Sequence, residues 1–260
     1  MASKFGRKLQ IGIDRIRGRK WVAPDPFAMS AIEARKSVTP SGELEQLFYG
    51  HNGKIAHKWH HYLEIYDHHF RRLRAPRAHP VRILELGIAG GGSLQIWRKY
   101  FGPQARIVGV DIDPACLDRV DPDTPAIIGD QCKPAILDAA LAQLGGGVDV
   151  VIDDGSHIGR HQIASFEYLY PRISEDGIYA CEDLLCSYSS EFEGGYRKKG
   201  TFIEYAKTLI DRLHAWHLEG ELKTTNMDFA QTTFGIFVYL QLIVIEKRRS
   251  KPPFHVRINE

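Results

Sequence analysis

Two pairs of acidic residues, Asp153-Asp154 and Glu182-Asp183, each follow a short apolar run that is typical of a buried strand. The carboxyl ends of parallel strands meet at the same edge of a sheet, so we expect the four carboxylates to converge in one crevice. Like charges that lie close together are unfavourable unless a cation or a proton compensates them. Oxygen ligands favour Mg²⁺ over Zn²⁺ or Fe²⁺. The spacing therefore predicts a magnesium site with Asp154, Glu182 and Asp183 as ligands.

His157 lies three residues after Asp154, and it is the one histidine of the twelve to which we assign a chemical role. A hydroxyl bound to a divalent ion is acidified, and a neutral imidazole beside it can take the proton. We therefore predict that His157 is a general base. The alternative is a capped loop with a surface histidine, which the neighbouring Glu182-Asp183 pair disfavours.

A glycine-rich turn with Gly87, Gly91 and Ser93 follows the first predicted strand. Glycines allow the chain to turn sharply and allow backbone N–H groups to approach a ligand. Asp111 follows the second strand, where a carboxylate can hold two ribose hydroxyls. The combination indicates a pocket for a nucleoside at the carboxyl ends of these strands. A plain turn with a surface aspartate is the competing interpretation.

Two cofactors compete for this pocket. A dinucleotide fold requires a second glycine, to admit the pyrophosphate, where this chain has Ala89. S-adenosylmethionine (SAM) has no phosphate but needs an acid near its amino group, and Glu85 is placed for that role. Asp130 and Gln131 follow the third strand, where adenine contacts would fall, and Asp153 is left for cofactor contact. Asp130 could equally cap the following helix. The pattern favours SAM, with an NAD(P)-dependent oxidoreductase as the second enzyme class.

Apolar runs alternate with helical periodicity from residue 57 to residue 245, which predicts an α/β fold with a mostly parallel sheet and helices on both faces. The last two runs have almost no connection between them, so we expect an antiparallel pair at the end of the sheet. The predicted strands are 81–86, 106–110, 126–128, 148–152, 178–180, 234–238 and 242–245. The predicted helices are 57–73, 93–101, 134–144, 161–170 and 201–216.

The composition excludes several classes of protein. The 260 residues include 34 Lys and Arg and 32 Asp and Glu, and the resulting net charge of +2 argues against a nucleic-acid partner. Four cysteines without a repeated short spacing do not form a disulfide framework. The sequence has no apolar run long enough to cross a membrane, and we expect a cytoplasmic protein without a membrane partner.

Taken together, the motifs resemble those of the Mg²⁺-dependent, SAM-dependent O-methyltransferases of natural-product biosynthesis, especially the macrolide-sugar O-methyltransferases and the cephalosporin 7-methoxylation protein. This resemblance implies a class I SAM-methyltransferase fold, which is Rossmann-like with a seven-stranded sheet, and SAM and Mg²⁺ as cofactors. It also implies that Asp154, Glu182 and Asp183 hold the metal and that His157 is the base. The segments that carry the resemblance, within residues 45–250, are His60-His61-Tyr62, Glu85-Leu86-Gly87, Gly91-Gly92-Ser93-Leu94, Gly109-Val110-Asp111, Gly129-Asp130-Gln131, Asp153-Asp154-Gly155-Ser156-His157 and Glu182-Asp183-Leu184.

The same resemblance favours a small hydroxylated acceptor, such as a glycosylated natural product, and a homo-oligomer. Relatives often carry a G-T-D-K run where residues 50–54 of this chain read Gly-His-Asn-Gly-Lys. The resemblance therefore assigns no contact to these five residues. A SAM-binding scaffold subunit without catalytic activity is the alternative from another class, but such a subunit has no need to keep the acids and His157. An iron oxygenase would need two histidines and one carboxylate, whereas the cluster offers one histidine.

We divide the chain into an N-terminal arm and helical segment, residues 1–75, and a methyltransferase domain, residues 76–260. The first twenty residues are rich in Lys and Arg with Asp14 as their only acid, and prolines punctuate 24–45 as a loop. We expect 1–75 to cover the cofactor or acceptor and to contribute oligomer contacts. The long connection 186–200 is expected to form a lid, with Tyr188 in contact with the acceptor.

Overall fold

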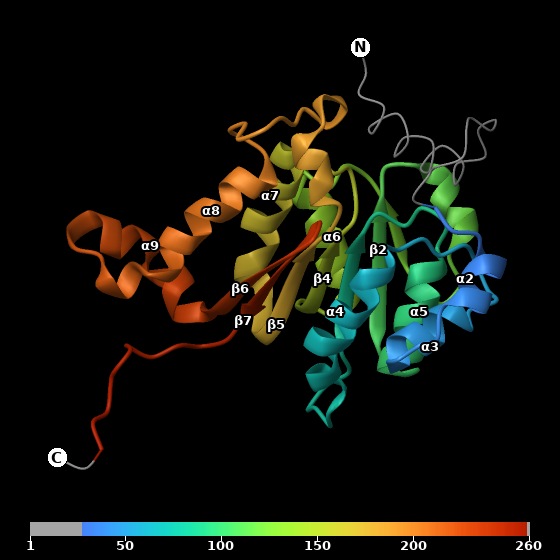
Figure 1. Ribbon diagram of the computed structural model, residues 1–260, viewed down its shortest axis with the longest axis horizontal. Helices are drawn as coiled ribbons and strands as arrows, with labels where there is room; N and C mark the ends of the chain where they lie inside the picture. The colour runs from blue at the N-terminus through green and yellow to red at the C-terminus, as the bar shows by residue number, and fades with distance from the viewer. Residues whose placement is uncertain (1–27, 259–260) are drawn as a thin grey trace.

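The structure is a computed structural model that describes residues 28–258, and a seven-stranded sheet forms its centre (Figure 1). The strands are β1 Arg82–Leu86, β2 Arg106–Asp111, β3 Ala126–Ile128, β4 Val148–Asp153, β5 Ile173–Cys181, β6 Thr233–Tyr239 and β7 Leu242–Lys247. Their order across the sheet is β3-β2-β1-β4-β5-β7-β6. β7 is antiparallel to both of its neighbours, and the other pairs are parallel. This arrangement confirms the predicted mostly parallel sheet with an antiparallel pair at its end.

Helices cover both faces of the sheet (Figure 1). The α-helices are α2 Ala31–Ser37, α3 Glu43–Tyr49, α4 His60–Phe70, α5 Gly92–Phe101, α6 Pro134–Leu144, α7 Gly159–Leu169, α8 Phe202–Leu213 and α9 Gly220–Thr232. On one face α6, α7 and α8 bury Leu137, Phe166 and Leu209, and on the other α4 and α5 bury Tyr66 and Trp97. Across residues 28–258, none of the helices combines the length and the hydropathy needed to cross a bilayer.

The register of the sheet places the acidic residues beside one another. β1 pairs with β4 so that Leu86 lies opposite Asp153, and β4 pairs with β5 so that Asp153 lies opposite Cys181. The residues that follow in the chain, Asp154 and Glu182, therefore leave the sheet at the same edge. This edge is the one at which parallel α/β sheets bind their ligands.

Helix α4 belongs to the same core as the sheet. The Tyr66 and Phe70 rings lie 5.5 and 5.8 Å from the Trp97 ring of α5, measured between centroids. The helix predicted over 57–73 begins at His60 and ends in a 3₁₀ turn, Arg71–Arg74. Its apolar stripe is fully buried, so this part of the N-terminal segment is held by packing against the sheet. The basic arm expected at 1–20 lies outside the described residues.

Three helices lie where the sequence pattern did not predict them. α2 begins with a capping box, in which Ser30 and Glu33 accept each other's backbone N–H groups at 3.2 and 3.0 Å. α3 buries Leu44, and α9, whose sequence has only a weak apolar stripe, buries Phe229 and Ala230. Helices this short or this weakly amphipathic depend on tertiary packing for their stability. The pattern of residues 24–45 therefore reads as a loop although the fold makes two helices there.

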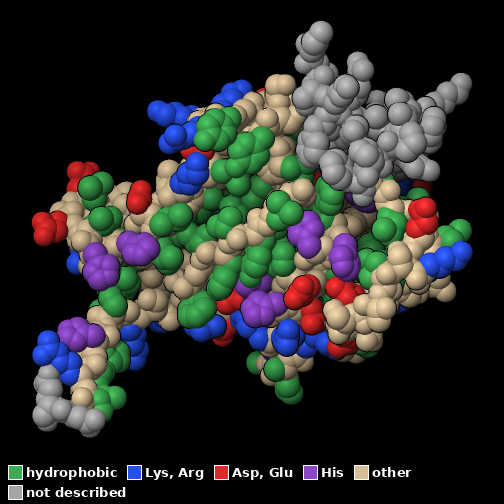
Figure 2. Space-filling model, in the orientation of Figure 1, with side chains coloured by type: hydrophobic (Ala, Val, Ile, Leu, Met, Phe, Trp, Pro, Cys, Tyr) green, Lys and Arg blue, Asp and Glu red, His purple; other side chains and the backbone are tan. Residues whose placement is uncertain are grey.

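The outermost strand, β6, presents an apolar edge. Phe234 and Val238 of this strand, and Leu240 in the turn after it, are each more than half exposed. Hydrophobic side chains gather over this part of the face shown in Figure 2. An edge strand with apolar side chains is a surface at which another chain can pair or pack.

Candidate active site

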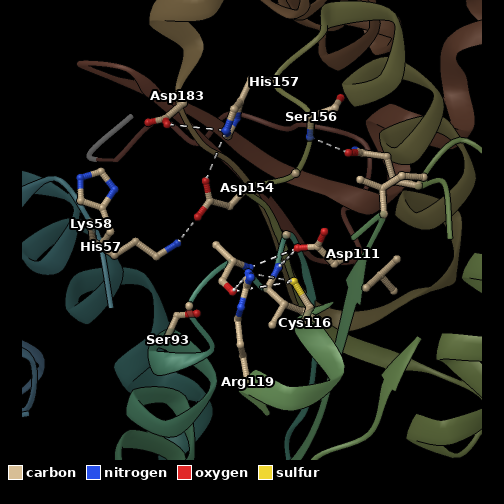
Figure 3. Close-up of a pocket in the computed structure, with 18 of the residues that line it drawn as sticks. His57, Lys58, Ser93, Asp111, Cys116, Arg119, Asp154, Ser156, His157 and Asp183 are labelled. Atoms are coloured by element: carbon tan, nitrogen blue, oxygen red, sulfur yellow. Dashed lines mark hydrogen bonds and ion pairs between the residues drawn. The ribbon is translucent and has the colours of Figure 1, made fainter. Parts of the chain in front are cut away.

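A cavity of about 450 Å³ opens at the carboxyl ends of β1, β2 and β4 (Figure 3). Its wall combines the glycine turn after β1, residues from the strand ends and residues 55–59 from the segment before α4. This position agrees with the general rule for ligand sites in open α/β sheets. The residues predicted for cofactor binding that line the cavity are Gly87, Ser93, Asp111, Asp130 and Gln131.

The backbone of the turn requires Gly87 and Gly91. Gly87 has a φ of 95°, and a Cβ there would collide with the carbonyl group of Asp154. Gly91 has a φ of 78°, and a Cβ there would collide with the carbonyl oxygen of Arg119. Only glycine combines this backbone conformation with such close approach. Gly91 stands behind the cavity wall, and its neighbour Gly90 lines it.

The Asp111 carboxylate holds the glycine turn and faces the cavity. Its Oδ2 accepts the backbone N–H groups of Ile88 and Ala89 at 2.9 and 3.1 Å, and its Oδ1 accepts that of Asp113 at 2.9 Å. Burial would raise the pKa of Asp111, but these backbone hydrogen bonds outweigh it and lower the pKa. The carboxylate is therefore ionised, and its remaining lone pairs can accept hydrogen bonds from a ligand hydroxyl.

Two other predicted cofactor acids are engaged by the protein itself. Asp130 lines the cavity, and its Oδ1 accepts the backbone N–H of Cys132 at 2.8 Å, which lowers the pKa of Asp130. Glu85 is completely buried beneath the cavity, where its Oε2 accepts from Ser93 Oγ at 2.8 Å and from Trp97 Nε1 at 3.2 Å. Glu85 is not part of the cavity wall, so it acts on the cavity through neighbours such as Ser93.

Gln131 ties the end of β3 to the end of β4. Its Nε2 donates to Asp153 Oδ1 at 3.0 Å and to Ser165 Oγ at 2.9 Å, and its Oε1 accepts the backbone N–H of Ser156 at 2.8 Å. Asp153 is completely buried and accepts the Tyr179 hydroxyl at 2.7 Å. Asp153 does not line the cavity, and its contacts hold the strand end in place.

Lys58, which the sequence pattern did not single out, lies at the centre of the acid cluster, and Figure 3 shows its ion pair with Asp154. Its Nζ lies 2.6 Å from Asp154 Oδ2, 2.6 Å from Glu182 Oε1 and 3.3 Å from Glu85 Oε1. The Lys58 side chain is 3% exposed. Glu182 Oε1 also accepts the Tyr66 hydroxyl at 2.6 Å. The chain thus supplies part of the positive charge that a cluster of carboxylates requires.

The cluster nevertheless holds more carboxylate than ammonium. Burial alone would lower the pKa of Lys58, but Asp154, Glu182 and Glu85 together raise it well above its usual value. Burial and the neighbouring Asp154 raise the pKa of Glu182 even though Lys58 opposes them. Burial also raises the pKa of Glu85. One ammonium therefore does not neutralise the site, and the oxygen donors suit an additional hard cation such as Mg²⁺.

One carboxylate oxygen each of Asp154 and Asp183 faces the Nε2 atom of His157 (Figure 3). We call these three residues the open face. His157 Nε2 is 3.9 Å from Asp154 Oδ1 and 3.8 Å from Asp183 Oδ2. One atom of each residue lies within 4.8 Å of the others. The other oxygen of Asp183 accepts from Trp59 Nε1 at 2.9 Å and from the Tyr62 hydroxyl at 3.1 Å. Two carboxylate oxygens and one imidazole nitrogen therefore share one space, in which the carboxylates suit a divalent ion and the nitrogen lies beside them as a proton acceptor.

The open face is built on unusual backbone. His157 and Asp183 have φ values of 57° and 53°, and Ala89 in the glycine turn has a φ of 45°. Non-glycine residues in this left-handed region are strained, and such residues cluster at functional sites. The His157 side chain is 6% exposed, and within the described part of the chain its Nδ1 has no hydrogen-bond partner.

Two predicted site residues lie away from the open face. Glu182 is buried behind it, on the side occupied by the Lys58 ammonium. Tyr188, at the end of the 3₁₀ turn Leu184–Tyr188, is 55% exposed and does not line the cavity. Phe192, from the same connection, does line the cavity, with its ring centroid 6.1 Å from that of His157.

Sequence reasoning missed four residues of the site. Lys58 and Trp59 lie in the first turn of the helix predicted over 57–73, where a lysine is normally exposed and a tryptophan belongs to the apolar stripe, so no local signal assigned them to the site. Cys116 and Arg119 come from the 3₁₀ helix after β2 and line the cavity beside Ala89, whose carbonyl oxygen accepts from Arg119 at 3.1 Å. Their position just after the strand-end acid Asp111 is the one cue that could have pointed to them.

Comparisons with known proteins agree with this geometry. No protein-family model matches the chain. The 8-demethyl-8-(2-methoxy-alpha-L-rhamnosyl)-tetracenomycin-C 3'-O-methyltransferase of Streptomyces olivaceus is 37% identical over 235 residues, which are 85% of this chain and 58% of that protein. The mycinamicin VI 2''-O-methyltransferase of Micromonospora griseorubida is 34% identical over 202 residues, 74% of this chain and 49% of that protein. The MycE methyltransferase of the mycinamycin pathway, solved with Mg and SAH, superposes with a TM-score of 0.62 at 32% identity, over 75% of this chain and 51% of that one.

The strand order and the position of the cavity define a class I SAM-methyltransferase fold. Within that class, the chain is similar to sugar O-methyltransferases of natural-product pathways, in line with the resemblance of its motifs. The chain spans about half the length of the curated relatives it matches.

Proposed function

We propose that this protein transfers the methyl group of SAM to a hydroxyl of a small glycosylated natural product, with Mg²⁺ as a second cofactor. The observation that carries the proposal is the open face of Asp154, His157 and Asp183 beside a nucleoside-sized cavity. The similarity to MycE supports the same chemistry, since MycE has been solved with Mg, SAH and mycinamycin VI.

The residues proposed to bind SAM surround the cavity. Asp111 would accept the ribose hydroxyls, because its carboxylate is ionised and faces the cavity. The glycine turn would bring its backbone N–H groups close to the ligand. The proposed set, in which the two completely buried acids act from behind the wall, is Glu85, Gly87, Gly91, Ser93, Asp111, Asp130, Gln131 and Asp153.

Bound Mg²⁺ would supply the positive charge that acidifies the acceptor hydroxyl. We propose Asp154 and Asp183 as its ligands, with Glu182 joining them when Lys58 releases it. His157 Nε2 takes the hydroxyl proton, since its buried ring is directed at both carboxylates. The hydroxyl oxygen then bonds to the methyl carbon as the carbon–sulfur bond breaks, and that electron pair stays on sulfur.

The acceptor class follows from the relatives, since the tetracenomycin O-methyltransferase is named for an acceptor that carries a rhamnosyl group. Phe192 lies beside His157 and offers an aromatic surface to such a ring. We also propose that the protein is a homo-oligomer, supported by the apolar edge of β6, and that it is cytoplasmic. Light scattering of the purified chain tests the oligomeric state.

The test of the proposal is incubation with SAM and a panel of hydroxylated glycosides, with Mg²⁺ or with EDTA, followed by mass spectrometry. We expect one methyl group on the acceptor and one equivalent of S-adenosylhomocysteine. His157→Ala should lower kcat by about 100-fold or more while calorimetry shows unchanged SAM affinity. Failure to bind SAM would refute the proposal as a whole. Activity that persists in EDTA would refute the role of the metal. Full activity of His157→Ala would refute the role of His157 as the base. SAM binding without transfer to any acceptor would favour the scaffold subunit.

A further inference from the structure

The five residues 55–59, which we call the strap, connect the acid cluster to the glycine turn. Ile55 forms a bridge with Gly91, and its carbonyl oxygen accepts the backbone N–H of Gly92 at 3.0 Å. All five residues line the cavity. At its other end, the strap is held by Lys58 and by Trp59, whose side chains bind acids of the cluster. One short segment therefore contacts both the proposed cofactor site and the proposed metal site.

The Lys58 ammonium is the main anchor of the strap on the acids. It contacts Asp154 Oδ2 and Glu182 Oε1 at equal distances of 2.6 Å, with almost no exposure to solvent. Asp154 and Glu182 are two of the three acids predicted to bind the metal. Lys58 thus sits between the carboxylates that a divalent ion would draw together.

We propose that Lys58 is a built-in counter-cation that competes with the divalent metal for Asp154 and Glu182. This inference rests on the proposed function, because it assumes that Mg²⁺ binds at this cluster. In the metal-free protein the ammonium holds the carboxylates together and keeps the site assembled. An ammonium and a dication repel each other and need the same oxygens, so the ion gains Asp154 Oδ2 and Glu182 only when Lys58 withdraws.

Withdrawal of Lys58 removes an anchor of the strap, and this links the metal to the cofactor. His57 lies next to Lys58 (Figure 3) and lines the cavity, so a shift of the strap alters the cavity wall. A ligand can shift an equilibrium only by its different affinity for the two states, and Mg²⁺ meets this condition because it binds the acids that Lys58 leaves. Metal binding and SAM binding are then coupled through residues 55–59, with the same factor in both directions.

The experiment measures Mg²⁺ binding and thermal stability of the full chain without SAM, so that activity is not the readout. Lys58→Met keeps the length of the side chain and removes its charge. We expect it to bind Mg²⁺ about tenfold more tightly than wild type. We also expect its melting temperature to fall in EDTA and to recover in Mg²⁺, because the ion replaces the missing ammonium.

Lys54→Met is the matched control from the chain just before the strap. Lys54 Nζ donates to the carbonyl oxygen of Val120 at 2.7 Å and lies 3.8 Å from Asp121, away from the acid cluster. We expect this variant to bind Mg²⁺ as wild type does. Lys58→Arg keeps the charge and should bind Mg²⁺ within about twofold of wild type.

The outcomes separate the inference from the proposed function. Mg²⁺ binding that is equal or weaker in Lys58→Met overturns the competition and leaves the metal site standing. A Lys58→Met protein that stays unfolded even in saturating Mg²⁺ overturns it too, as does Lys58→Arg binding Mg²⁺ as tightly as Lys58→Met. Absence of Mg²⁺ binding by all four proteins overturns both the metal site and the inference.

Discussion

Gly87→Ala tests whether the glycine turn sets the position of Asp154. A Cβ at residue 87 would overlap the carbonyl oxygen of Asp154, and it would lie 2.7 Å from that carbonyl carbon and 3.1 Å from Gly155 Cα. All three are backbone atoms of the loop after β4, so rotation of a side chain cannot relieve the collision. The loop itself has to move, and with it the carboxylate that faces His157.

The expected loss of stability in Gly87→Ala has two parts, and a control variant separates them. A side chain in the left-handed region costs roughly 1–2 kcal/mol, and overpacking adds roughly 1–3 kcal/mol. Gly87→Ala should therefore lower the free energy of unfolding by roughly 2–5 kcal/mol. Gly146 has a similar φ of 90°, but a Cβ there would have nothing within 4 Å. Gly146→Ala should cost only the first part, roughly 1–2 kcal/mol.

Urea denaturation followed by circular dichroism gives the two free energies, and titration calorimetry gives the SAM affinity of each variant. We expect Gly146→Ala to bind SAM as wild type does. Gly87→Ala should lose about tenfold or more in affinity, because small displacements in a binding site are costly. Equal destabilisation of the two variants would show that the collision is relieved without cost. Unchanged SAM affinity in Gly87→Ala would show that the turn does not position the site.

Three further substitutions test other parts of the structure. Asp111→Asn should weaken SAM binding about tenfold, because an amide donor would face the backbone donors of the turn; unchanged affinity by calorimetry would contradict the ribose role. The pKa of Asp149 is lowered below its usual value. Burial by itself would raise it, but hydrogen bonds from Arg82 outweigh the effect of burial. The resulting stabilisation is present above about pH 4 and is lost as the pH falls through the lowered pKa. The difference in unfolding free energy between wild type and Asp149→Asn should therefore close in acid, and a difference independent of pH would count against this assignment. Phe192→Ala should raise the KM for the acceptor with SAM affinity unchanged, whereas Tyr188→Ala should leave both at wild-type values; the reverse result would give the acceptor contact to Tyr188.

The regular elements of the sheet could be predicted because their local sequence and their burial agree. Central strands are covered on both faces, so runs such as 81–86 and 148–152 are mostly apolar. A stripe of aromatic residues, which the fold buries, predicts the helix α4. The helices α2, α3 and α9 have no comparable local signal, because contacts with other elements, such as those of Leu44 and Phe229, decide whether they form.

The sequence by itself determined which acids stand at the rim of the cavity. Asp111, Asp154 and Asp183 lie at the end of a strand or within two residues after it, and a parallel sheet brings the carboxyl ends of its strands to one edge. Only the tertiary structure decided which atoms of these residues are free and which are held. Lys58 is 96 positions from Asp154 and 124 from Glu182 along the chain, yet its ammonium lies 2.6 Å from both. The reason is physical: buried carboxylates are stabilised by whichever cation the fold brings near them, and charge acts through space without regard to position in the sequence.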